Sequence, residues 1–339
     1  MHSNTRNLFF VLISCASMLV IASAWAKGKV VVADRTDQSI TVIDVQTDTP
    51  TTIEMPDNGE PMYVAYSSTY NRVFVGDRAN SRVVVFDADT FAVETTVGTD
   101  AGVFHMWASD GNDQLWVNND IDNTITIIDT VTLDVIDTAF APADLVASGG
   151  KLHDVIIDPV RPFAYATMIG VAGANDYVVK YSTESFDEVD RQAVGEDPHV
   201  SLARQSDLLY VPCQNSNEVV VLNRDTLDSE PSIFVPSAHG AWMSRNGKLF
   251  FTTNIAGGGT DGVFEIDTQT NAVLDFWDTP EAVPHNITST PNGKKLYVTH
   301  SGAFSDVVSV YERQNKNEPF MQIITVTTGL NPFGLFYVP

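Results

Sequence analysis

Short segments with β-strand character recur along the whole chain after residue 27, and this recurrence restricts the fold more than any other feature. The segments are rich in Val, Ile, Tyr, Phe and Thr, and turn residues separate them. No long stretch has the apolar spacing of a helix. Residues 285–326 show one complete unit, in which HNITST, KKLYVTH, VVSVYE and MQIITV are four successive candidate strands. The same order repeats every 40 to 48 residues.

Four antiparallel strands per unit, in seven units of this period, predict an all-β, seven-bladed β-propeller. The repeats begin at residue 29 with KVVVAD, which resembles a second strand, and they end with NPFGLFYVP, which resembles a first strand. We therefore expect the C-terminal strand to complete the N-terminal blade and close the circle, because closure hides both sheet edges. The prediction is a single propeller domain over residues 27–339.

The second strands carry variations on Leu-Tyr-Val-Thr-Asn, such as LYVTH at 296–300 and LYVPC at 209–213, and strands such as VVVFD at 83–87 follow them. In these motifs the chain resembles the YVTN-repeat family of seven-bladed propellers, over essentially all of residues 28–339. The resemblance implies the fold and leaves function open, because the same scaffold hosts many roles. One role that it implies is an interaction module whose rim loops contact another exported protein.

Histidines recur at one phase of the repeat, where the innermost strand of a blade should begin. Their contexts are VFHMWAS, KLHDVII, DPHVSLA, SAHGAWM and VPHNITS, and EPMYVAY and NPFGLFY align at the same phase. The seven aligned positions are Met62, His105, His153, His199, His239, His285 and Phe333. Because the first strand of every blade faces the central channel, we expect these side chains to form a ring at one channel mouth.

A second ring is predicted from the last residue of each YVTN-like segment, since the loops that follow these residues should lie on the same rim. Its members are Asp34, Asp77, Asn119, Met168, Cys213, Asn254 and His300. His300 falls in the same blade as His285. We therefore expect it to lie near the histidine ring.

Imidazole nitrogens are the commonest protein ligands of zinc, copper and iron, and three or four of them converging at about 2.0–2.1 Å would hold a divalent ion. Sulfur donors nearby would favour copper over zinc or iron. A neighbouring acid such as Asp154 would orient an outer imidazole nitrogen. The predicted function is an exported metal-binding propeller, with copper preferred. The predicted ligands are His105, His153, His199, His239 and His285, with His300 and Met62 as accessories.

Two other interpretations of the histidines stay open. They could lock strands within their own blades, as the Gly-His step does in WD-type propellers, although that network uses a Trp on the third strand and none is present here. Alternatively, histidines beside Asp154 or Asp197 could shuttle protons in a hydrolase of lactones. The usual acid and amide ligands of such hydrolases are not recognisable, and no Gly-x-Ser-x-Gly motif occurs.

Residues 1–26 are typical of a secretory signal peptide, with Arg6, a long apolar run and an Ala-Trp-Ala triplet. This predicts a periplasmic or secreted protein. Lipidation at Cys15 is the alternative, although the apolar run continues well past that residue. No later stretch approaches the roughly 20 apolar residues that a membrane span needs. The net charge of −24 argues against nucleic acid as a partner and favours cations near the surface.

Overall fold

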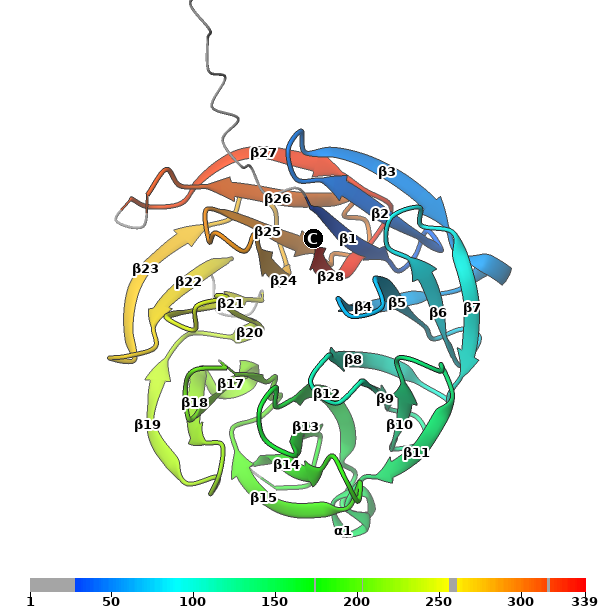
Figure 1. Ribbon diagram of the computed structural model, residues 1–339. Helices are drawn as coiled ribbons and strands as arrows, with labels where there is room; N and C mark the ends of the chain where they lie inside the picture. The colour runs from blue at the N-terminus through cyan, green and yellow to red at the C-terminus, as the bar shows by residue number, and fades with distance from the viewer. Residues whose placement is uncertain (1–27, 174, 203, 256–260, 316–317) are drawn as a thin grey trace, which may run out of the picture.

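The computed structural model describes residues 28–339 apart from 174, 203, 256–260 and 316–317. The predicted signal peptide and the alternative lipidation at Cys15 lie outside the described residues. Within them, seven four-stranded antiparallel sheets form blades around a central channel (Figure 1). The predicted all-β, seven-bladed propeller is confirmed. No helix in this part of the chain is long and apolar enough to cross a bilayer.

Each blade runs outward from the channel in chain order. The first three blades are β28 (Pro332–Val338), β1 (Lys29–Asp34), β2 (Ser39–Asp44) and β3 (Thr49–Glu54); β4 (Pro61–Ser67), β5 (Arg72–Asp77), β6 (Arg82–Asp87) and β7 (Val93–Gly98); and β8 (Val103–Ser109), β9 (Gln114–Asn119), β10 (Thr124–Asp129) and β11 (Val135–Phe140).

The remaining four blades follow the same order around the circle. They are β12 (Lys151–Ile157), β13 (Phe163–Ile169), β14 (Asp176–Ser182) and β15 (Glu188–Val194); β16 (Ser201–Leu202), β17 (Leu208–Cys213), β18 (Glu218–Asn223) and β19 (Ser229–Phe234); β20 (Ala238–Met243), β21 (Leu249–Asn254), β22 (Gly262–Asp267) and β23 (Ala272–Asp278); and β24 (Pro284–Ser289), β25 (Lys295–His300), β26 (Val307–Glu312) and β27 (Met321–Thr327). Among the described residues, three short helices lie in connections: η1 (Pro56–Asn58), α1 (Ala143–Ala147) and η2 (Gln214–Ser216).

The middle strands of each blade are mostly apolar and buried because both faces of the sheet pack against neighbouring blades. Residues 30–33 of β1 and 83–86 of β6 are completely buried. The outermost strands, such as β3 and β7, are mostly polar and exposed. The core is therefore divided into apolar layers between blades. The innermost strands line the central channel.

The first blade contains both ends of the propeller. β28 pairs antiparallel with β1, with Val338 opposite Lys29 and Tyr337 opposite Val30. The predicted closure by the C-terminal strand is confirmed, and it leaves no open sheet between the first and last repeats (Figure 1).

Six of the seven innermost strands begin with a two-residue bulge, whereas in the fifth blade Pro198 pairs with Cys213 and Ser201 with Tyr210 without a register shift. In β8, for example, Val103 pairs with Asn119 and Met106 with Val117, which leaves two residues opposite one. The first bulge residues are Met62, Phe104, His153, His239, His285 and Phe333, and His199 holds the corresponding position in the fifth blade. The second bulge residues are Tyr63, His105, Asp154, Gly240, Asn286 and Gly334, and Val200 holds the corresponding position in the fifth blade.

The bulges correct one part of the predicted alignment. His105 was aligned with His153, but Phe104 occupies that position and His105 lies one residue later. Consecutive bulge residues point differently, so His105 reaches the channel from the level of Asp154 and not from that of His153.

Candidate metal centre

In six of the seven blades, the side chain at the first of these two positions meets its neighbours around the channel. The ring centroids of successive histidines lie 4.6 Å apart for His153 and His199, 4.0 Å for His199 and His239, and 4.7 Å for His239 and His285. Two phenyl rings complete the circle, since Phe333 lies 4.1 Å from His285 and Phe104 lies 5.2 Å from His153. We call these six residues the channel ring: Phe104, His153, His199, His239, His285 and Phe333. The predicted convergence of these four histidines is therefore present.

His105 approaches the channel ring from the second bulge level. Its ring stacks on Tyr63, with the centroids 3.6 Å apart. The centroids of His153 and His199 lie 5.4 and 5.5 Å away. His105 is thereby fixed on one side and faces two imidazoles of the channel ring on the other.

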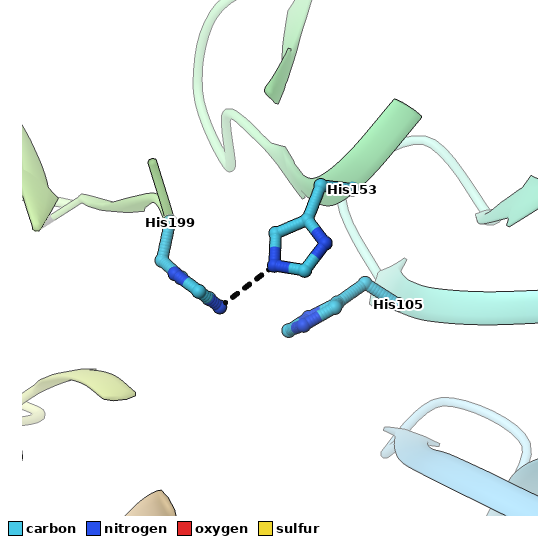
Figure 2. Close-up of side chains that lie close together, drawn as sticks. All are labelled: His105, His153 and His199. Carbon is cyan, nitrogen blue, oxygen red and sulfur yellow. Dashed lines mark hydrogen bonds between the residues drawn. The ribbon is translucent and has the colours of Figure 1, made fainter. Parts of the chain in front are cut away.

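His105, His153 and His199 form a triad in which one ring nitrogen from each residue lies within 4.8 Å of the other two (Figure 2). The Nε2 atoms of His153 and His199 are 3.0 Å apart and share a hydrogen bond. Two nitrogens bound tetrahedrally to one ion at 2.0–2.1 Å would lie about 3.3 Å apart. The pair of His153 and His199 is therefore close to the spacing of two ligands of one ion, and His105 lies within 4.8 Å of both.

Asp154 fixes the orientation of His105. Its Oδ1 lies 2.8 Å from Nδ1 of His105, and its Oδ2 accepts a hydrogen bond of 3.0 Å from the backbone N–H of Val200. With Nδ1 donating to the carboxylate, Nε2 of His105 carries the free lone pair. This is the orienting role that the sequence predicted for Asp154.

Burial keeps the ring imidazoles neutral. It lowers the pKa of His105, His199 and His239 well below the usual 6.5. It also lowers the pKa of His153 and of His285 to about 3. Neutral imidazoles are the form that binds metals, so the histidines are ready to act as ligands at neutral pH.

Several of these nitrogens have no hydrogen-bond partner among the described residues. They are Nε2 of His105, Nδ1 of His199, and both nitrogens of His239. A buried polar atom left unpaired costs about 1–3 kcal/mol, so such a concentration of them is unusual. Because a neutral imidazole carries one N–H and one lone pair, a cation could satisfy at most one nitrogen of each ring, such as Nε2 of His105. The donor set therefore fits a transition metal.

Two predicted accessories do not join the triad. His300 uses both ring nitrogens near its own blade, with Nδ1 3.1 Å from the Ala282 carbonyl and Nε2 2.9 Å from Oγ of Ser309. Met62 is completely buried in an apolar layer that also contains Phe74 and Val103. Neither side chain is in a position to act as a ligand of the triad.

The predicted second ring also turns into the blades. Asp34 accepts a hydrogen bond of 2.6 Å from Oγ1 of Thr41, and Asn119 donates one of 2.9 Å to Oγ1 of Thr126. Cys213 is buried and donates to the Val211 carbonyl, and burial raises the pKa of its thiol. These residues hold neighbouring strands together, so they form no second layer of ligands.

Three residues that shape the site were not predicted from the sequence. Tyr63 stacks on His105, Phe104 completes the channel ring, and Asn286 donates hydrogen bonds to the Tyr63 hydroxyl at 3.2 Å and to the Phe333 carbonyl at 3.3 Å. All three are bulge residues. Counting two bulge positions per blade, in place of one, would have found them.

Comparisons with known proteins show which solved structures have a similar fold. No family model matches the chain. No curated protein sequence matches it either. Among solved structures, a putative 6-phosphogluconolactonase from Bacteroides uniformis is similar, with 16% identity, a TM-score of 0.73, and coverage of 92% of this chain and 100% of that chain.

Two further structures have the same overall shape. The periplasmic gluconolactonase of Pseudomonas aeruginosa has 16% identity and a TM-score of 0.72, with 92% of this chain and 99% of that chain covered. Hydrazine synthase of Kuenenia stuttgartiensis has 15% identity and a TM-score of 0.68, with 81% and 88% covered. At such identities the likeness shows the seven-bladed propeller fold alone.

Proposed function

We propose that this protein binds one transition-metal ion, copper in preference to zinc or iron, through His105, His153 and His199. The observation that carries the proposal is the meeting of three buried imidazoles from three successive blades, one of them oriented by a carboxylate. His239 and His285 extend the same ring and would serve as further ligands if the ion moves along it. Copper is first because Cu²⁺ binds nitrogen sites more tightly than the other divalent first-row ions.

The proposed setting is the periplasm or the exterior of the cell, as residues 1–26 suggest. A net charge of −24 would raise the local concentration of cations around the protein. The proposed role there is sequestration or delivery of the metal. Delivery would require contact with another exported protein that receives the metal. If no metal binds, the alternative is an interaction scaffold in which the histidines are purely structural.

The test is metal analysis of protein purified from the periplasm without an affinity tag, followed by titration of the stripped protein with Cu²⁺ and Zn²⁺. We expect one equivalent of tightly bound metal and a higher melting temperature when metal is present. The variant His199→Ala should bind copper more than about 100-fold more weakly, because it loses a ligand. The double variant His199→Ala, His239→Ala should bind none.

The matched control is His300→Ala, which removes a buried imidazole outside the triad. This variant should lose about 1–3 kcal/mol of stability and keep its copper affinity, because His300 bonds only within its own part of the propeller. Metal-free protein whose melting temperature is unchanged by copper or zinc would refute the proposal.

A lactone hydrolase is the second candidate function. It is favoured by the His105–Asp154 pair, which has the geometry of a general base with its orienting carboxylate, and by the fold shared with two proteins titled as lactonases. The test is hydrolysis of gluconolactone by the metal-free protein. A rate above background that His105→Ala abolishes would support it, and a rate equal to background would exclude it.

A further inference from the structure

A cavity of about 50 Å³ adjoins the triad. His105, His199 and Asp154 contribute to its wall, together with Tyr63 and Asn286. The cavity is therefore bordered by two of the three proposed metal ligands and by three other polar side chains.

Three aromatic side chains close this cavity on a second side. Trp107, Trp242 and Phe336 line it, and the same three residues line a larger cavity of about 330 Å³. The Phe336 centroid lies 5.9 Å from Trp107 and 5.8 Å from Trp242, so the rings meet edge to face. We call these three residues the aromatic gate.

The larger cavity lies at the opposite mouth of the channel. Its wall includes Ser109 and Met243, the last residues of β8 and β20, whereas the triad and the bulges lie at the beginnings of the innermost strands. A path into the triad from this mouth must pass the aromatic gate.

The size of the small cavity limits what can occupy it. A volume of 50 Å³ accommodates a molecule of about two or three non-hydrogen atoms. The Tyr63 hydroxyl accepts a hydrogen bond from Asn286, and among the described residues its own proton has no acceptor. Tyr63, which lines the cavity, therefore has one hydrogen-bond donor that no described residue uses.

Charge at the opposite mouth favours an anion. Arg204 and Arg245 line the larger cavity of a chain whose net charge is −24. The acid in the same wall, Asp110, already accepts hydrogen bonds from Ser67 and Ser68. Two cationic side chains at an access route raise the local concentration of anions and their rate of arrival.

We propose that the metal held by the triad takes a small inorganic anion of about two or three non-hydrogen atoms as a further ligand, in the 50 Å³ cavity, and that this anion arrives through the opposite mouth past the aromatic gate. The inference rests on the proposed metal-binding function. A metal that is held by three histidines and has one exchangeable coordination position is typical of reactive sites. Purely structural metal sites have all their positions filled by protein ligands.

The experiment uses protein loaded with one equivalent of Cu²⁺ and compares azide with benzoate, a bulky anion. The electron paramagnetic resonance and visible spectra report binding to the metal. Azide should change both spectra in a saturable way. Benzoate is too large for the cavity, so it should leave both spectra unchanged even at a concentration roughly 100-fold higher. Azide without effect, or benzoate acting like azide, would overturn the inference while the metal site stands.

The variant Trp242→Ala tests the gate, with Met243→Ala as its control, because Met243 lines only the larger cavity. Trp242→Ala should admit benzoate, whereas Met243→Ala should behave as the wild type does. Full copper stoichiometry and azide binding show that each variant is folded. If no form of the protein binds copper, the proposed function and this inference fall together.

Variants of Arg204 and Arg245 test whether the anion enters through the opposite mouth. The double variant Arg204→Gln, Arg245→Gln should bind azide several-fold more slowly at low salt, as measured by stopped-flow absorption. The control is Arg191→Gln, whose guanidinium pairs with Asp144 on the outer side of a blade. Equal association rates in the three proteins would overturn access through the opposite mouth.

Discussion

The histidines of this protein differ in what their ring nitrogens bond. His300 commits both nitrogens, His105 commits one to Asp154, and His239 has both nitrogens unpartnered among the described residues. A ligand must keep a lone pair free and directed at a shared point. The number of histidines in a repeat is therefore a weaker guide to a metal site than the hydrogen bonds that each one makes.

Replacing Asp154 should weaken metal binding without removing a ligand. In Asp154→Asn, the neutral amide is a weaker acceptor for Nδ1–H of His105, so we expect about 10- to 100-fold lower copper affinity in a competition titration. The control is Asp197→Asn, since Asp197 lies 3.8 Å from Nε2 of His153, beyond hydrogen-bond distance. Equal losses in the two variants would mean that general charge near the channel matters and that the orientation of His105 does not.

At the scale of elements, the two-residue bulge positions the site. It places an extra residue at the start of six of the seven innermost strands, and the neighbouring second strand accommodates it. The backbone N–H groups of Asp154, Gly240 and Asn286 each donate to a Thr hydroxyl on that strand, at 2.9, 2.9 and 3.0 Å. A Thr near the end of the second strand, in the YVTN-like segment, thereby supports the bulge next to it.

Gly240 is the position where the bulge leaves least space. A Cβ there would lie 2.1 Å from the His285 carbonyl oxygen and 2.7 Å from Oγ1 of Thr253. Gly240→Ala should therefore lower the free energy of unfolding by about 1–3 kcal/mol in urea denaturation. Gly98→Ala, with nothing within 4 Å of the added carbon, is the control and should be nearly neutral. A neutral Gly240→Ala would show that the sixth blade can move away from the seventh.

At the scale of the whole molecule, closure of the circle and convergence of the ring are linked. Each blade contributes the start of its innermost strand to one channel, and β28 places Phe333 between His285 and Phe104 only because the C-terminal strand joins the first blade. The site thus depends on the complete propeller, since no single blade contains more than one residue of the triad.

Stability should decrease in mild acid. His153 and His285 have pKa values lowered to about 3, and His300 to about 4, in each case mainly by burial. Between these values and 6.5 the unfolded chain binds protons that the folded chain does not, so each such histidine costs up to about 1.4 kcal/mol of stability per pH unit as the pH falls. Urea denaturation of metal-free protein at pH 7 and pH 4.5 measures the difference.

Two buried acids act in the opposite direction. Burial raises the pKa of Asp34 to about 7 and that of Asp197 to about 6, so each destabilises the fold as the pH rises from about 4 to these values. The buried histidines outnumber these acids, and the net effect should be lower stability at pH 4.5. Equal or greater stability at that pH would contradict the prediction, and His300→Gln should reduce the pH dependence by about one histidine's share.

Much of this architecture could be predicted from the sequence because it follows from local patterns. The strand segments and their period determine seven blades, the match between residues 29–34 and the second strands determines closure, and the shared phase of His153, His199, His239 and His285 places them in one channel. These features need only the alternation of apolar segments and turns, which neighbouring residues impose on one another.

Which imidazoles meet was decided by the tertiary structure. The one-residue offset of His105 arises from the register between β8 and β9, and a shift of one residue turns a side chain in another direction. Both ring nitrogens of His300 are hydrogen-bonded, one to the Ala282 carbonyl and one to the Ser309 hydroxyl. The Tyr63 ring stacks on His105 across a blade boundary. Such contacts join residues of different strands and blades. Their geometry depends on pairing and packing over the whole circle, and a linear pattern does not contain it.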